Sequence, residues 1–230
     1  MSLSIGVSAF GQQHFAASVT TGAVTPQTSG STFALFITGG AVSSLTDSQS
    51  NTYTLRQTFT INGGTRTAWM YDCQNAVGAA SMTFTYTPTG TGTCVILMAE
   101  IATGAGSGIY PVLDGTVQLT SSTNTLVGPS ATAAGSNEVG ISCIFGAGAG
   151  TTVVFSDSTG WNNLLQSITD AVNYYVGAIS ATTISSAGSY NDTYSGSTNV
   201  GTSNGLVTAL YKASGGIAPS APTIGQAWIG

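Results

Sequence analysis

Charged residues are scarce in this sequence. They make up 5% of its 230 residues, whereas an ordinary soluble domain contains about 25%. Only Arg56, Arg66 and Lys212 are basic, and the net charge is −5. Binding to a phosphate backbone or to an anionic lipid surface requires clustered Lys or Arg side chains. The sequence therefore argues against a nucleic-acid partner and against a membrane partner.

Long hydrophobic segments are also missing. No apolar run approaches the roughly 18 residues of a membrane-spanning helix. Residues 1–15 lack the basic region and the continuous apolar region of a secretory signal peptide. We therefore expect a strand at the start of the chain. We also expect a protein that leaves the cell by lysis, as a virion component does.

Histidine and cysteine are too few for the common catalytic and metal sites. His14 is the single histidine, whereas a catalytic triad needs a base beside its nucleophile and a zinc site needs several His or Cys ligands. Cys73, Cys94 and Cys143 are odd in number, so at least one is unpaired within the chain. In a simple meander Cys73 and Cys94 lie at opposite ends of a sheet, about 20 Å apart. A disulfide needs Cα atoms within about 7 Å, yet the sequence leaves this pairing open.

The acidic residues show no catalytic pattern. Glu100 lies in an apolar strand and is either a half-buried acid with a raised pKa or, more commonly, a residue on the solvent side of an edge strand. Residues 47–51 place oxygen ligands at alternate positions, as a calcium loop does, but Thr52 stands where such loops have Gly. Asp, Ser and Asn also favour turns, which is the interpretation we prefer. We expect no enzyme, no cofactor and no metal.

What the sequence does contain is a succession of short strand patterns separated by turn residues. The apolar runs 33–38, 95–101 and 139–145 are typical of buried central strands. One segment, 161–172, has Leu164, Leu165 and Ile168 at helical spacing, although neighbouring strands can override a short helix. We predict an all-β fold, a two-sheet antiparallel sandwich with jelly-roll-like character.

The order of these patterns repeats along the chain. An apolar strand, a polar turn, an aromatic strand and a closing apolar strand occur in that order, twice. Their positions are 33–38, 45–53, 69–71 and 95–101 in the first half and 140–145, 155–161, 173–176 and 206–211 in the second. We therefore predict two similar halves, at residues 1–136 (with a connecting segment) and 137–214, followed by an extended arm at 215–230.

Three segments carry a resemblance to a known group of proteins. They are the turn at 42–54, the segment Trp69–Gly78, and residues 185–190 ahead of the closing strand at 209–212. Together they resemble a widespread group of Ser/Thr/Gly-rich β-sandwich proteins found in bacteriophage virions and in bacterial surface and secreted proteins. The resemblance covers most of residues 30–214. It implies a structural or recognition module, not a reaction.

These observations predict a non-catalytic bacteriophage virion protein, either a capsid decoration protein or a tail or fibre component. The alternative is a bacterial surface or secreted adhesin, or a carbohydrate-binding module. Expected partners are other virion proteins, copies of the chain itself in a homo-oligomer, and a host-surface glycan. The arm carries apolar side chains among Gly and Pro, with no charge after Lys212, so we expect Ile224, Trp228 and Ile229 to contact a neighbouring subunit.

Overall fold

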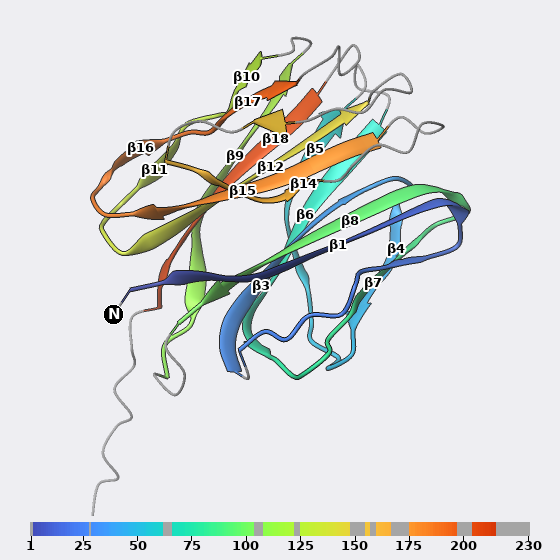
Figure 1. Ribbon diagram of the computed structural model, residues 1–230, viewed down its shortest axis with the longest axis horizontal. Coiled ribbons are helices and arrows are strands. Elements are labelled where there is room, and N and C mark those ends of the chain that lie inside the picture. The colour runs from blue at the N-terminus through green and yellow to red at the C-terminus, as the bar shows by residue number, and fades with distance from the viewer. Residues whose placement is uncertain are drawn as a thin grey trace, which may run out of the picture.

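The protein is described by a computed structural model over residues 2–27, 29–61, 66–103, 108–121, 125–147, 155–156, 160–166, 175–196 and 204–214. Within these ranges the chain forms strands and no helix (Figure 1). Every strand pairing is antiparallel. The predicted all-β antiparallel sandwich is therefore confirmed.

The first large sheet contains five strands in the order β1-β8-β3-β6-β5. Their bounds are β1 Ser4–Ala16, β3 Ser29–Thr38, β5 Thr54–Ile61, β6 Arg66–Val77 and β8 Gly92–Ala102. The central strands β3 and β8 are buried along almost their whole length. This matches the continuous apolar runs that predicted them, since a strand covered on both faces needs no alternation of polar residues.

The second large sheet also contains five strands, in the order β14-β15-β12-β18-β9. Their bounds are β9 Pro111–Ser121, β12 Glu138–Ala147, β14 Asn162–Gln166, β15 Tyr175–Ile184 and β18 Asn204–Ala213. The predicted helix at 161–172 is wrong where the structure describes it, because β14 occupies 162–166 and pairs with β15. Hydrogen bonding to a neighbouring strand here overrides the helical spacing of the leucines.

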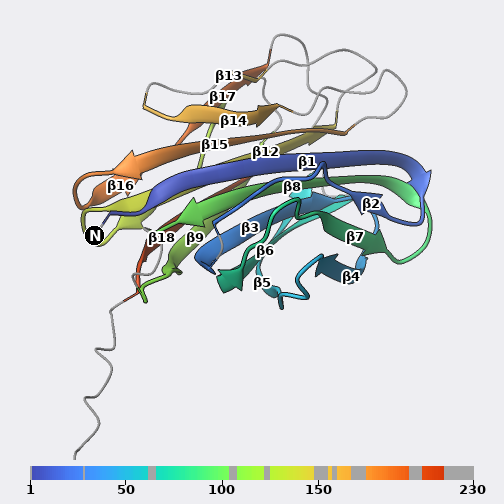
Figure 2. The ribbon, with the colours of Figure 1, turned by 60° about the horizontal axis from the view of Figure 1, so that its bottom comes forward.

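Smaller sheets cover the outer faces. The first outer sheet has the order β2-β7-β4, the second outer sheet has the order β10-β17-β13, and β11 pairs with β16. The bounds of these short strands are β2 Val19–Thr20, β4 Val42–Asp47, β7 Phe84–Pro88, β10 Thr125–Val127, β11 Ala131–Ala133, β13 Phe155–Ser156, β16 Gly188–Tyr190 and β17 Thr193–Gly196. Figure 2 shows the two large sheets as the inner layers, with β4 and β7 outside one and β13 and β17 outside the other.

The two halves have the same pairing order. The order β1-β8-β3-β6-β5 corresponds strand for strand to β9-β18-β12-β15-β14, and β2-β7-β4 corresponds to β10-β17-β13. The prediction of two similar halves is confirmed by this correspondence. The division at residue 136 does not follow it, however, because β9 precedes that residue and pairs with β18 along 111–121. The first half therefore ends with β8, and the second begins with β9.

The inner faces of the large sheets form the central core. Strand β1 contacts β14 and, equivalently, β9 contacts β5, so the halves are related as by a two-fold axis. The largest side chains of this core include Phe36, Phe59, Met70, Phe145 and Tyr211. Phe59 and Phe145 stack across the halves with ring centroids 6.3 Å apart. The chain therefore packs like a dimer whose two subunits are joined in one polypeptide.

A second core lies between the first large sheet and its outer sheet. Here Phe33 and Phe84 meet edge to face at 5.3 Å, beside Leu35, Met98 and Tyr86. On the other side of the molecule the described apolar cluster under β11 and β16 is small, with Ala131, Ala133, Ile184 and Leu210 as its buried members. Aromatic packing thus fills the space under the first outer sheet, whereas the described cluster under β11 and β16 contains no buried aromatic residue.

Candidate functional site

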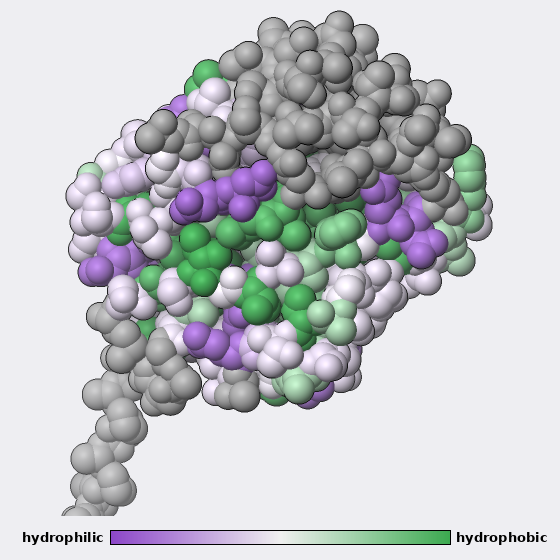
Figure 3. All heavy atoms as spheres, viewed as in Figure 1, coloured by the Kyte–Doolittle hydropathy of each residue, from purple (hydrophilic) through white to green (hydrophobic). Residues whose placement is uncertain are grey.

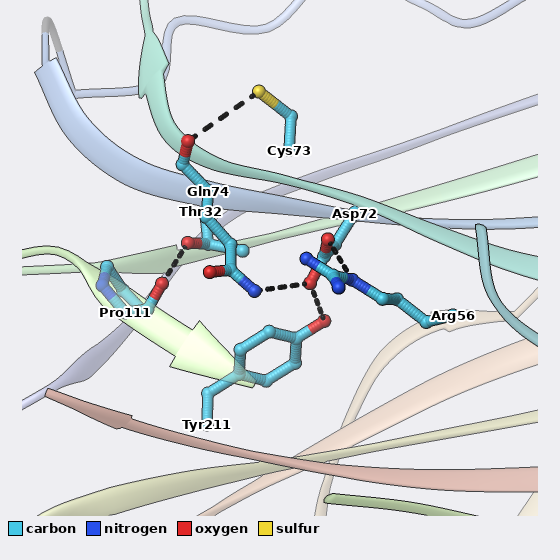
Figure 4. A network of polar contacts seen from close by, with 7 residues as sticks. All are labelled: Thr32, Arg56, Asp72, Cys73, Gln74, Pro111 and Tyr211. Carbon is cyan, nitrogen blue, oxygen red and sulfur yellow. Dashed lines mark hydrogen bonds and ion pairs between the residues drawn. The ribbon is translucent and has the colours of Figure 1, made fainter. Parts of the chain in front are cut away.

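A buried carboxylate, that of Asp72, lies where the two halves meet. Asp72 of β6 is buried and accepts from Arg56 Nε at 2.6 Å, from Gln74 Nε2 at 3.1 Å and from the Tyr211 hydroxyl at 3.5 Å (Figure 4). Burial, and next the Asp72 charge, raise the pKa of Tyr211 well above its usual value. Nearby, Thr32 donates to the Pro111 carbonyl at 2.6 Å. These contacts join β5, β6 and β3 to the second half, which is a structural role.

Glu100 lies inside the protein and not on the solvent side of an edge strand. It is 1% exposed. Its carboxylate accepts from Val7 N at 3.1 Å, Gln27 N at 2.9 Å and Ser31 Oγ at 2.5 Å. It therefore ties β1, the segment before β3, and β3 itself to β8. The interpretation of Glu100 as an exposed residue is wrong, because apolar neighbours in sequence do not reveal three donors that converge from other strands.

Asp47 supports a turn. Its Oδ1 accepts from Gln49 N at 2.8 Å and Asn51 N at 3.2 Å, and its Oδ2 accepts from Asn51 Nδ2 at 2.8 Å and from the Tyr53 hydroxyl. Donors from the chain itself thus occupy both oxygens that a cation would need. The turn interpretation agrees with these contacts. The equivalent turn around Asp157 lies outside the described residues.

A further buried acid, Asp192, belongs to the second half. Ser180 Oγ donates to its Oδ2, and Thr193 N donates to its Oδ1 at 2.7 Å. Ser180 Oγ also lies 2.7 Å from the Tyr194 hydroxyl, which reaches the Ser142 carbonyl at 3.0 Å. Burial, and next the Asp192 charge, raise the pKa of Tyr194 well above its usual value. The group joins β17 of the outer sheet to β12 and β15.

The three cysteines are all buried and none forms a disulfide. Cys73 pairs with Phe33 in the middle of β3, whereas Cys94 pairs with Gln13 near one end of β8. Burial raises the pKa of Cys73 to about 11, and burial raises that of Cys143 well above its usual value. A nucleophilic cysteine needs a lowered pKa, so these thiols are packing residues.

The exposed side chains that best fit a contact role are aromatic and lie on β1. Phe10 is 45% exposed and Phe15 is 73% exposed. Phe15 has φ 46°, a backbone region that a bulky residue rarely adopts, and it sits in the register shift between Gln13 and Ala16. Strain of this kind is common where a side chain is directed toward a partner. We call Phe10 and Phe15 the β1 aromatics.

The predicted contact residues Ile224, Trp228 and Ile229 lie outside the described residues, as does the whole arm at 215–230. No sequence pattern singles out the β1 aromatics, because Phe10 and Phe15 occur in an ordinary strand pattern. A positive φ at a phenylalanine has no signature in a single sequence. The register shift that accompanies it becomes visible only when β1 is paired with β8.

Among the residues that the structure describes, no group of three or more His, Cys, Asp and Glu is placed to hold a metal ion. No helix within those ranges is long and apolar enough to cross a membrane. No family model, curated protein or solved structure matches this chain.

Proposed function

We propose that this chain is a non-catalytic structural or recognition protein of a bacteriophage particle, either a capsid decoration protein or a component of the tail or its fibres. The observation that carries the proposal is that the described charged groups bond to other groups of the protein. Asp47, Asp72, Glu100 and Asp192 each accept several hydrogen bonds from the protein, and Lys212 contacts Asp114. These described ionisable groups thus serve the fold.

The surface that remains is nearly uncharged. Pale colours of intermediate hydropathy cover much of the coloured part of Figure 3, with smaller green and purple areas. Such a surface loses little solvation free energy when it is placed against another neutral surface, because few charges are desolvated. Interface cores are likewise depleted of charged residues and enriched in aromatic ones, which the β1 aromatics supply.

The repeated architecture supports the same role. Eight strands of each half occupy equivalent positions, five in the large sheet and three in the outer sheet. This double-sheet arrangement favours two jelly rolls packed through their large sheets. Two similar halves present similar outer sheets on opposite sides of the molecule (Figure 2). A part of this kind is suited to lie between repeated neighbours in a particle, in contact with copies of itself or with other virion proteins.

Mass spectrometry of purified phage particles tests the proposal. Peptides of this chain should appear in particles after nuclease treatment and density-gradient purification, in a fixed ratio to the major capsid or tail protein. Immunogold labelling of the same particles would then place the chain on the head or on the tail. Absence of its peptides from purified particles, with its presence in the lysate, would sink the proposal.

A second candidate function is glycan recognition by a bacterial surface or secreted protein. The observation that favours it is Phe15, whose exposed ring offers a face on which a sugar can stack. The isolated protein would then bind specific glycans on an array, and Phe15→Ala would abolish that signal. Binding on the array without any chain in purified particles would favour this function over the first.

A further inference from the structure

Three hydroxyl side chains form a row across the second large sheet. Ser142 of β12 is directly opposite Ser180 of β15 on one side and Thr208 of β18 on the other. All three residues are buried. Their neighbours Ile141 and Cys143 point into the central core, so the row faces the second outer sheet. Contact of the Tyr194 hydroxyl with Ser180 agrees with that direction.

The corresponding face of the first large sheet has no such row. There β3 presents Leu35 between Tyr71 and Met98, and Ile37 between Trp69 and Ile96. Most of these side chains pack in the apolar core beneath the first outer sheet. The halves share a strand order, but the hydroxyl row of the second half stands where the first half has large apolar side chains.

Two hydroxyls of the row have no hydrogen-bond partner among the residues that the structure describes. They are Ser142 Oγ and Thr208 Oγ1, and both residues are 0% exposed. Ser180 Oγ, by contrast, is bonded to Asp192 and Tyr194. Buried hydroxyl groups are nearly always bonded to protein or to ordered water. Two unsatisfied groups side by side therefore point to a missing partner that both can use.

We propose that an ordered internal water molecule bridges Ser142 Oγ and Thr208 Oγ1. Residues directly opposite each other on antiparallel strands have Cβ atoms about 5 Å apart, which leaves the two hydroxyls within reach of one water at about 2.8 Å from each. A buried water typically makes about three hydrogen bonds. As the third partner we assign the Tyr194 hydroxyl, which donates to the Ser142 carbonyl at 3.0 Å and can accept from the water. This inference does not depend on the proposed function.

A crystal structure of the full chain at high resolution tests the site directly. We expect density for one water within hydrogen-bond distance of both hydroxyl oxygens. The same density should be lost from crystals of Thr208→Val and retained in crystals of Thr208→Ser. Either an empty site or a direct contact between the two hydroxyls would overturn the proposal.

Stability measurements provide a second and independent test. If a water is bound, Thr208→Val and Ser142→Ala each lower the denaturation midpoint. The midpoint of the double variant should be no lower than that of the less stable single variant, because either substitution alone already releases the water. Thr32→Val is the matched control, since its hydroxyl donates directly to Pro111 O and its effect should add to that of Thr208→Val. A higher midpoint for Thr208→Val would contradict the proposal, as removal of an orphaned hydroxyl is stabilising.

Discussion

The ion pair of Arg56 and Asp72 joins a partly exposed cation to a buried anion. The two side chains are 28% and 0% exposed. Arg56→Gln leaves the Asp72 carboxylate buried with Gln74 and Tyr211 as its remaining side-chain donors. We expect the free energy of unfolding to fall by about 1–3 kcal/mol, measured by urea denaturation. The double variant Arg56→Gln/Asp72→Asn removes the stranded charge and should recover part of that loss. Strictly additive losses would contradict this account.

Phe15 offers a test in which stability and binding move in opposite directions. Asn tolerates positive φ better than Phe does, so Phe15→Asn should raise the free energy of unfolding by about 1 kcal/mol. If the ring contacts a partner, the same variant should be incorporated less well into particles. Phe10→Asn is the control, because Phe10 lacks a positive φ and gains nothing in stability. Normal incorporation of both variants would exclude the β1 aromatics as contact residues.

Single residues were predictable from sequence only where their partners are local. The Asp47 turn was predicted correctly because Gln49 and Asn51, its main donors, lie two and four positions along the chain. Glu100 was misplaced because Val7, its donor on β1, is 93 positions away. Asp72 gave no signal at all for the same reason, since Tyr211 is 139 positions away.

At the scale of strands, the continuous apolar runs located β3, β8 and β12 correctly, because burial on both faces leaves an unambiguous pattern. Edge strands were harder. Strand β14 has helical spacing but is held by β15, and β9 lies in the stretch that was predicted to be a connecting segment. An edge strand has one paired neighbour, so its sequence carries less of the information that fixes it.

A glycine marks a close approach between strands of the two halves. A Cβ atom on Gly205 of β18 would lie 2.7 Å from Ile61 Cγ2, Phe59 Cδ2 and Thr60 O of β5. We therefore expect Gly205→Ala to lower the free energy of unfolding by about 1–3 kcal/mol through overpacking. Gly115 of β9 is the matched control, because nothing lies within 4 Å of its Cβ position. Equal effects of the two substitutions in urea denaturation would mean that β18 and β5 do not pack this closely.

At the scale of the whole molecule, a buried thiol and two buried phenol hydroxyls predict that the folded state loses stability at alkaline pH. Burial raises the pKa of Cys143, Tyr194 and Tyr211 well above their ordinary values of 9.0 and 10.0. Above those values the unfolded chain releases protons that the folded chain retains, so ionisation favours unfolding and stability falls as pH rises. The urea midpoint should thus decline from about pH 9 upward. Cys143→Val should delay the onset of this decline, and a midpoint that stays constant to about pH 11 would contradict the assignment of these groups as buried.

The repeat was found from sequence because four patterns recur in order, yet the sequence placed the division between the halves too late. Strand β9 sits in a Gly-, Ser- and Thr-rich stretch that resembles a connection. Its counterpart β1 and β9 itself both precede the first of the four recurring patterns in their halves, so the repeat does not include either strand. The pairing of β9 with β18, which mirrors that of β1 with β8, reveals the equivalence.

The segment 215–230 carries the remaining prediction about assembly. The last described contacts of the chain are the pairing of Ala213 with Pro111 and the hydrogen bond from Ser214 N to Tyr110 O at 2.8 Å. A chain that ends at residue 214 keeps these contacts, so we expect it to fold with an unchanged urea midpoint. If Ile224, Trp228 and Ile229 contact a neighbouring subunit, the truncated chain should lose particle attachment or self-association, because those apolar side chains no longer leave water.

Analytical ultracentrifugation and particle incorporation of the two forms measure this. Replacing Ile224, Trp228 and Ile229 together by Ser in the full chain is the matched control, since it keeps the length of the arm and removes only its apolar groups. Both changes should weaken assembly to a similar degree if the apolar contacts are the cause. Normal assembly of the truncated chain would reject the subunit-contact role, and failure of that chain to fold would instead place residues 215–230 in the core of their own sandwich.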